Sequence, residues 1–222
     1  MKLRLACLVV LSFTFVSGSV FGQAIEVSPY AGFYWPGDNG EVGKLQSNQV
    51  LGLRGGAYIS PNAELGLNYA WSNHFQPSHT NEPAAFAGNL GFQQGKVRSK
   101  VLEAEFTYHF GSRRLLGSSV RPYVAIGAGR LKALVNNDEE FVLNVRPFTK
   151  PCGCIGYVAN DVLQDGDKFF TFSYGAGLKA TRVWGPMGFF GDFRGRTIPN
   201  FFGHGMNWPE LSAGVNFSWG ER

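Results

Sequence analysis

Two cysteines separated by one glycine, Cys152 and Cys154, are the residues best suited to redox or metal chemistry in this chain. A Cys-x-Cys pair can close a small disulfide, exchange thiols or offer two thiolates to a metal ion. Two thiolates are too few for a closed zinc site unless histidines or carboxylates join them. We therefore interpret the pair as a disulfide that staples its own loop.

A histidine and two glutamates are the other candidates for catalysis. His204 is followed two positions later by Met206, whose thioether cannot serve as the nucleophile that a histidine activates. Glu103 and Glu105 would share one face of a strand, where paired carboxylates can perform acid–base chemistry. Arginine or lysine partners across the fold explain these glutamates equally well, and we prefer that structural interpretation.

The segment 132–167 is acidic, with Asp138, Glu139 and Glu140 followed by Asp161, Asp165 and Asp167. A cation could bind there, but no spacing matches a calcium-binding loop. We expect a solvated surface loop, and we predict no catalytic residue, no metal and no cofactor anywhere in the chain.

Composition excludes several classes of protein. The chain is 44% hydrophobic, 15% aromatic and 16% charged, has 30 glycines, and has a mean hydropathy of −0.08. It is too aromatic for disorder, not apolar enough for a helical membrane protein, and too rich in glycine for a helical bundle. A glycine- and aromatic-rich β protein remains.

Residues 1–22 have the order of a cleaved signal peptide. Lys2 and Arg4 precede an apolar run at residues 5–16, which is shorter than the ~20 residues that span a bilayer. Cleavage would discard Cys7 and leave residues 23–222 as one exported domain in an oxidising compartment. No cluster of basic residues in that sequence indicates nucleic-acid binding.

The mature chain alternates between polar and apolar residues with the period of a strand. Glu210, Ser212 and Gly214 share one face near the C-terminus, while Leu211 and Ala213 share the other. Strands of about ten residues are long enough to cross a membrane when tilted. The predicted strands are 25–35, 50–60, 64–71, 102–110, 121–131, 168–180, 187–197 and 210–219.

The connections alternate in length. Turns at 60–62, 111–120 and 182–186 are mostly short, whereas 36–49, 72–99, 132–167 and 198–207 are longer. Short turns on one rim and long loops on the other are typical of outer-membrane barrels. We predict an all-β, eight-stranded antiparallel transmembrane β-barrel with short periplasmic turns, long extracellular loops and both termini on the periplasmic rim.

The polar face of these strands carries six acids and five bases, which can neutralise one another inside a barrel. The opposite face is apolar and would meet lipid, whereas a soluble barrel would have to pack or expose all its aromatic residues. The predicted interior network is Glu26, Arg54, Glu64, Glu103, Glu105, Arg121, Lys179, Asp192, Arg194, Arg196 and Glu210. The predicted aromatic girdles at the membrane interfaces comprise Tyr34, Trp35, Trp71, Phe75, Tyr108, Phe110, Trp184 and Trp219.

Strand segments throughout the mature chain resemble the OmpA-like outer-membrane β-barrel superfamily. They are IEVSPYAGFYW, LRGGAYISPNAELGLNYAW, RPYVAIGAGR, FSYGAGLKA, FFGDFRGR and ELSAGVNFSWG. Many members end in an aromatic residue, whereas three residues follow Trp219 here. The resemblance implies a Gram-negative outer membrane as location, and lipid, periplasmic chaperones and the barrel-assembly machinery as partners.

Two classes of function remain open. The first is a non-enzymatic barrel with a structural role, a surface ligand bound by its loops, or a narrow, porin-like pore. The second is a lipid-modifying enzyme, because lipid A deacylases are eight-stranded barrels with a His-x-Ser-Asn motif. Met206 occupies the serine position after His204, so we favour the first class.

Overall fold

A computed structural model describes residues 24–35, 47–75, 97–111, 113–115, 118–135 and 141–220 of the chain. The predicted signal peptide lies outside these ranges, as does most of the predicted loops 36–49 and 72–99. Within the described ranges, no helix is long and apolar enough to cross a membrane.

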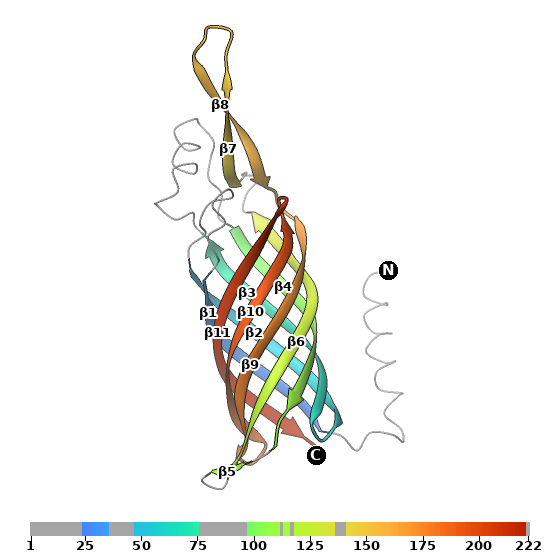
Figure 1. The fold of residues 1–222 in the computed structure, drawn as a ribbon. Helices are drawn as coiled ribbons and strands as arrows, with labels where there is room; N and C mark the ends of the chain where they lie inside the picture. Colours follow the sequence, from blue (N-terminus) through green and yellow to red (C-terminus); the bar gives the residue numbers. More distant parts are fainter. Residues whose placement is uncertain are drawn as a thin grey trace, which may run out of the picture.

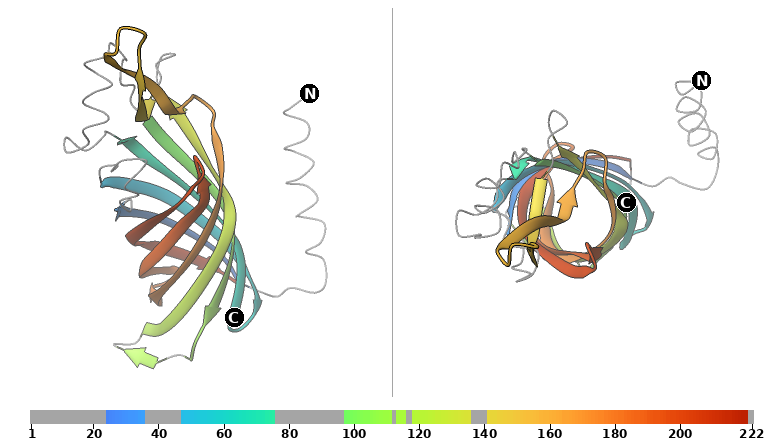
Figure 2. Two further views of the ribbon diagram at one scale, coloured as in Figure 1. Left: turned by 45° about the horizontal axis from the view of Figure 1, so that its top comes forward. Right: turned by 90° about the horizontal axis from the view of Figure 1, so that it is seen from above.

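Eight antiparallel strands form a closed barrel, as the sequence predicted (Figure 1). Pairing of the first strand with the last, and of β4 with β6, closes the sheet. The view along the axis shows the strands surrounding a lumen (Figure 2). The barrel strands are β1 (Ile25–Tyr34), β2 (Asn48–Ser60), β3 (Ala63–Phe75), β4 (Val97–His109), β6 (Ser118–Val135), β9 (Lys168–Trp184), β10 (Met187–Phe201) and β11 (His204–Trp219).

Three further strands lie in the connections. The short β5 (Arg113–Leu115) pairs with the start of β6 in the connection between β4 and β6. The strands β7 (Phe141–Thr149) and β8 (Ile155–Leu163) pair only with each other among the described strands. This hairpin occupies most of the third predicted loop and projects from the rim opposite β5 (Figure 1).

The prediction of a fourth long loop at 198–207 was wrong. β10 continues to Phe201 and β11 starts at His204, with only Phe202 and Gly203 between them. Both turn residues have positive φ, 54° and 85°, as the tightest hairpin turns require. Strand pairing continues through Ile198 and Met206, which the prediction had assigned to the loop.

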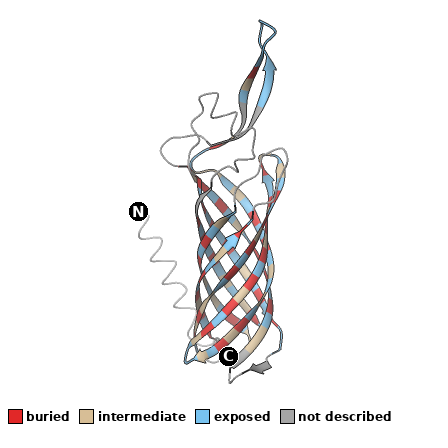
Figure 3. Cartoon of the chain, turned by 90° about the vertical axis from the view of Figure 1, so that its left-hand side faces the viewer, coloured by how far each residue is buried: buried red, intermediate tan, exposed pale blue. Residues whose placement is uncertain are grey.

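The two faces of each barrel strand differ as predicted, with buried and exposed residues alternating along the wall (Figure 3). Leucine, phenylalanine and tryptophan side chains cover the outer face, where lipid would lie. The exposed girdle aromatics are Trp35, Trp71, Tyr108, Phe110, Trp184 and Trp219. The prediction for Tyr34 was wrong, because its side chain is only 2% exposed and stacks on Trp208. The side chain of Phe75 lies outside the described part.

Candidate functional site

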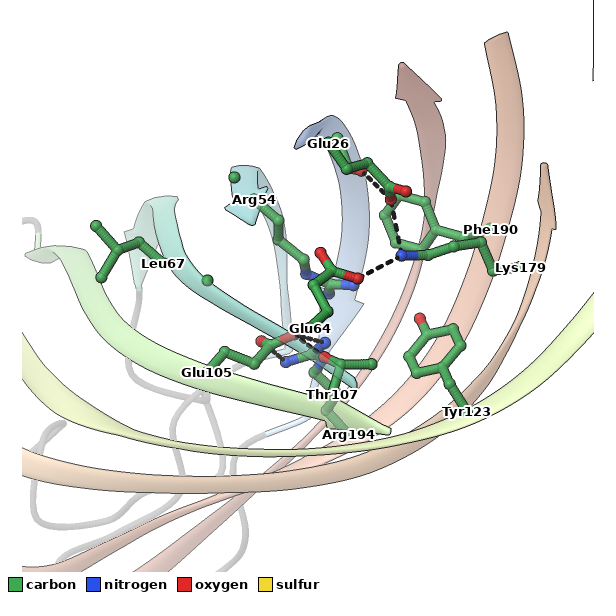
Figure 4. Close-up of a pocket in the computed structure, with 13 residues that line it drawn as sticks. Glu26, Arg54, Glu64, Leu67, Glu105, Thr107, Tyr123, Lys179, Phe190 and Arg194 are labelled. Atoms are coloured by element: carbon green, nitrogen blue, oxygen red, sulfur yellow. Dashed lines mark hydrogen bonds and ion pairs between the residues drawn. The ribbon is translucent and has the colours of Figure 1, made fainter. Parts of the chain in front are cut away.

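The charged side chains of the inner face meet across the lumen in three groups. In the group nearest the short turns, Lys179 of β9 bridges two glutamates (Figure 4). Its Nζ lies 2.7 Å from Oε1 of Glu26 and 3.1 Å from Oε2 of Glu64. His109 Nε2 lies 3.1 Å from the same Glu64 oxygen. His109 has the strand parity of Glu103 and Glu105, but it is not among the predicted network residues.

The middle group is built around Asp192 of β10. Its Oδ2 accepts hydrogen bonds from Nη1 of Arg54 at 2.6 Å, from Nε of Arg194 at 3.0 Å and from Oη of Tyr123 at 2.7 Å. The guanidinium of Arg194 also forms a two-pronged pair with Glu105 of β4. Arg54 lies on β2 and Tyr123 on β6, so this group links β10 to three strands that are not its sheet neighbours.

The third group lies nearer the hairpin rim. Arg196 donates from Nε to Glu103 at 3.0 Å and from Nη1 to Glu210 at 2.8 Å. Glu103 also accepts hydrogen bonds from the hydroxyls of Thr171 at 2.9 Å and Ser173 at 3.2 Å. All five side chains are buried, and charges buried in this way need such partners.

The structure therefore brings ten of the predicted network residues into ion pairs. Arg121 is placed differently: it lies at the short-turn end, where its guanidinium donates to the Asn62 side chain. Sequence alternation could place these residues on one face, but it could not assign partners to them.

A small cavity lies between the group nearest the short turns and the middle group. It is a cavity of about 20 Å³, bordered by Glu26, Arg54, Glu64, Glu105 and Lys179 among others (Figure 4). A buried water needs roughly 10–15 Å³ measured in this way. This section of the lumen can therefore hold about one water, and it is too small for an organic ligand.

Above the charged groups, at the hairpin rim, the lumen is filled by apolar side chains that we call the apolar plug. Tyr34 and Trp208 stack within it at 5.5 Å between ring centres. The apolar plug comprises Tyr34, Val50, Ala70, Val97, Val101, Leu131, Ala133, Val135, Leu163, Ile198, Phe201, Met206 and Trp208. Sequence analysis missed it, although Met206 and Trp208 share the inward parity of Glu210 and could have revealed it.

Met206 and the two glutamates considered for catalysis have structural contacts instead. His204 is half-buried at the start of β11, and Met206, at the position a serine would need, is buried in the apolar plug. Glu103 and Glu105 both serve as partners of arginines. Among the described residues, no group of three histidine, cysteine or acidic side chains could hold a metal ion.

The hairpin β7–β8 carries the cysteine pair at its tip. Cys152 and Cys154 form a disulfide there, and Lys150 N donates to the carbonyl of Cys154 at 2.9 Å. Three apolar side chains of the hairpin face solvent: Phe148 is 46%, Ile155 66% and Val158 49% exposed. We call these three residues the hairpin patch. Such exposure beyond the membrane wall is a frequent mark of an interaction site.

A closed antiparallel barrel with an apolar outer wall and a charged interior defines a transmembrane β-barrel. Comparison with family models agrees: the model of the outer membrane protein beta-barrel domain matches residues 8–216. The chain belongs to this family, which places it in the outer membrane.

Solved structures show the same fold at low sequence identity. Neisserial surface protein A is 12% identical, with 89% of this chain and 97% of that chain covered and a TM-score of 0.55. OprG from Pseudomonas aeruginosa is 8% identical, with coverage of 90% and 97% and a TM-score of 0.51. Among curated proteins, none matches the chain.

Proposed function

We propose that the chain is a sealed, non-enzymatic outer-membrane barrel that acts at the cell surface through its β7–β8 hairpin. The observation that carries the proposal is the combination of a filled lumen with an exposed apolar patch on the one described element that leaves the barrel. The filled lumen favours this role over the narrow pore, because ion pairs and the buried apolar side chains occupy the described interior and the cavity between the charged groups holds about one water.

The hairpin patch supports a role in surface contact. Phe148 lies over Gly156, where a Cβ atom would come within 2.7 Å of the phenylalanine ring. Phe148 and Val158 share one face of the hairpin with Arg146, whereas Ile155 lies on the other face. The hairpin thus presents apolar side chains on both faces, and a protein or other apolar surface would cover them.

The test compares cells that produce three forms of the full chain. They are the wild type, a Phe148→Ser/Ile155→Ser/Val158→Ser variant, and a control with Arg146→Ser, Thr149→Ser and Lys150→Ser on the same hairpin. Retention of washed cells on an apolar polymer and on protein-coated surfaces is measured at equal surface levels of the chain. We expect the hairpin patch variant to lose most of its retention and the control to keep it. Equal retention by wild type and hairpin patch variant would contradict the proposal.

The side of the outer membrane on which the hairpin lies is tested separately by chemical labelling. Intact cells are treated with a reductant and a maleimide that does not cross the membrane, and peptides are analysed by mass spectrometry. The proposal expects modification of Cys152 and Cys154 on intact cells. Labelling only after cells are broken would place the hairpin on the periplasmic side and overturn the proposal.

The burial of Met206 in the apolar plug supports the non-enzymatic part of the proposal. A hydroxyl nucleophile beside His204 would be required for the deacylase-like alternative. Mass analysis of lipid A from producing and non-producing cells tests this part. We expect identical acylation in the two samples, and loss of an acyl chain only in producing cells would favour the enzyme.

A further inference from the structure

Five basic side chains lie together on the outer wall of the barrel, on the strands β4, β6 and β9. We call them the outer basic cluster: Arg98 and Lys100 of β4, Arg130 and Lys132 of β6, and Lys168 of β9. All five are exposed, and their strands are consecutive neighbours in the sheet. In the strand register, Lys100 is directly opposite Lys132, and Lys132 is directly opposite Lys168. These lysines therefore form a row across three strands, although they are far apart in the sequence.

The outer basic cluster begins where the apolar wall ends. On β4 the outward residues just below it are Leu102 and Phe106, and on β9 they are Phe170 and Phe172, all exposed. Arg130 is paired in register with Leu102 on one side and Phe170 on the other. The cluster therefore lies at the upper boundary of the lipid-facing band, on the same rim as the hairpin.

No second group of charged side chains lies on the outer wall of the described barrel strands. The other exposed charged side chain on their outer wall is Arg182, which is near the opposite rim. At the height of the cluster, the outward residues of β10 and β11 include Pro199, Gly205 and Asn207, which carry no charge. Within the described strands, the β4, β6 and β9 side of this rim is thus basic, whereas the β10 and β11 side is uncharged.

Four side chains of the outer basic cluster form no ion pair within the described part of the protein. No described carboxylate forms an ion pair with Lys100, Arg130, Lys132 or Lys168. The acids of the neighbouring turn have other partners: Asp165 accepts from Val135 N at 3.1 Å and Asp167 from Gln164 N at 2.9 Å. Adjacent strands are about 4.8 Å apart, and like charges directly opposite each other destabilise a sheet. A bound anion would relieve this repulsion.

We propose that the outer basic cluster binds the phosphate groups of the glycolipid in the outer leaflet, the lipid A headgroup. Family membership places the barrel in the outer membrane, and the cluster lies where the acyl region gives way to headgroups. Lysines bind phosphate as point charges, and a row of three lysines can contact a headgroup that carries more than one phosphate. An acidic macromolecule in solution is a poorer fit, because the cluster is on the lipid-facing wall and not on the projecting hairpin. This inference does not depend on the proposed role of the hairpin patch.

The test measures lipid binding by the refolded full chain in neutral detergent micelles. The probes are lipid A with both phosphates and lipid A from which both have been removed. The variant Lys100→Gln/Lys132→Gln/Lys168→Gln is compared with the charge-matched control Arg146→Gln/Lys150→Gln/Arg182→Gln. Each lysine near an anionic surface contributes about fivefold to binding, so we expect the cluster variant to bind phosphorylated lipid A on the order of 100-fold more weakly. The control should bind within about twofold of the wild type.

A second measurement stays informative even if the cluster variant folds poorly. Lysine acylation of the wild type is quantified by peptide mass spectrometry with and without each probe. Protection of Lys100, Lys132 and Lys168 by phosphorylated but not by dephosphorylated lipid A would support the proposal. Equal protection by both lipids would overturn it, as would equal affinity of variant and wild type. Protection by inorganic phosphate alone or by dextran sulfate, without protection by lipid A, would assign the cluster to a soluble anion and also overturn it.

Discussion

Arg194 illustrates how a single charged residue helps to fill the lumen of this barrel. Its guanidinium joins Asp192 on its own strand to Glu105 on β4, and it is almost completely buried. The charge is used for packing, because it fills the lumen while satisfying two carboxylates. Arg196 and Lys179 also fill the lumen, and each of them pairs with two glutamates.

Replacing Arg194 by methionine should destabilise the barrel strongly. The substitution leaves Glu105 and Asp192 buried with one partner fewer, and breaking a buried pair in this way costs about 3–5 kcal/mol. The free energy of unfolding is measured by urea titration of the refolded chain, with Arg146→Met on the exposed hairpin as control. The control should change by less than about 0.5 kcal/mol.

The double variant Arg194→Met/Glu105→Met separates a lost charge pair from lost volume. It removes one of the two carboxylates that Arg194→Met leaves behind, so it should be more stable than the single variant. A double variant that is as unstable as the sum of the two single variants would show that the residues act independently and would contradict the network.

Trp208→Ala should destabilise the barrel through the apolar plug. The indole is 3% exposed and stacked on Tyr34, and removal of a buried tryptophan side chain costs about 3–5 kcal/mol. Phe148→Ala on the hairpin is the matched aromatic control and should be nearly neutral. Equal unfolding free energies for the two variants would show that the apolar plug contributes nothing.

The sequence was sufficient to predict the positions of some of these side chains but not of others. Alternation and charge balance were enough to place Glu103, Arg194 and their companions on one face. They were not enough to place Tyr34, because an aromatic residue at a strand end can face outward into an aromatic girdle or inward into the apolar plug. His109 joins the network only because β3 and β9 bring Glu64 and Lys179 beside it.

Among the elements, the hairpin β7–β8 is the one most separable from the barrel. Its strands pair with each other and with no other described strand. Leu163, at its end, is by contrast buried in the apolar plug. The hairpin is therefore an appendage up to that residue, and the barrel below it should fold without the appendage.

Deletion of residues 144–161 should leave the barrel folded. Leu163 and Phe141 are retained, so no residue of the apolar plug is lost. Folding is measured as the difference in gel mobility between unheated and heated samples, which a closed barrel displays, and as the urea midpoint. A deletion variant with a single mobility would indicate that the hairpin is required for barrel closure.

Strand ends were the elements hardest to predict. The segment 198–207 was predicted as a longer loop, whereas the structure has a tight turn at Phe202 and Gly203. The outer basic cluster could not be predicted at all, since Lys100, Lys132 and Lys168 become neighbours only through the register of three strands. Register depends on pairing across the whole sheet, which one-dimensional periodicity does not encode.

At the scale of the whole molecule, the surfaces of the barrel differ in their chemistry. The outer wall is apolar, the outer basic cluster borders it on one rim, and the hairpin extends beyond that rim. Two kinds of side chain fill the lumen. Ion pairs lie nearer the short turns, and the apolar plug lies nearer the hairpin rim. The average hydropathy near zero results from these opposite faces, because apolar residues point outward and most charges point inward.

Conductance of the purified full chain in a planar lipid bilayer tests the sealed barrel most directly. A general porin is inserted under the same conditions as a positive control. The filled lumen predicts no stable current steps above the bare-bilayer level when refolded protein, verified by its gel mobility, is present. Reproducible ohmic steps from the wild-type chain, absent from protein-free detergent, would contradict the sealed lumen and favour the narrow pore.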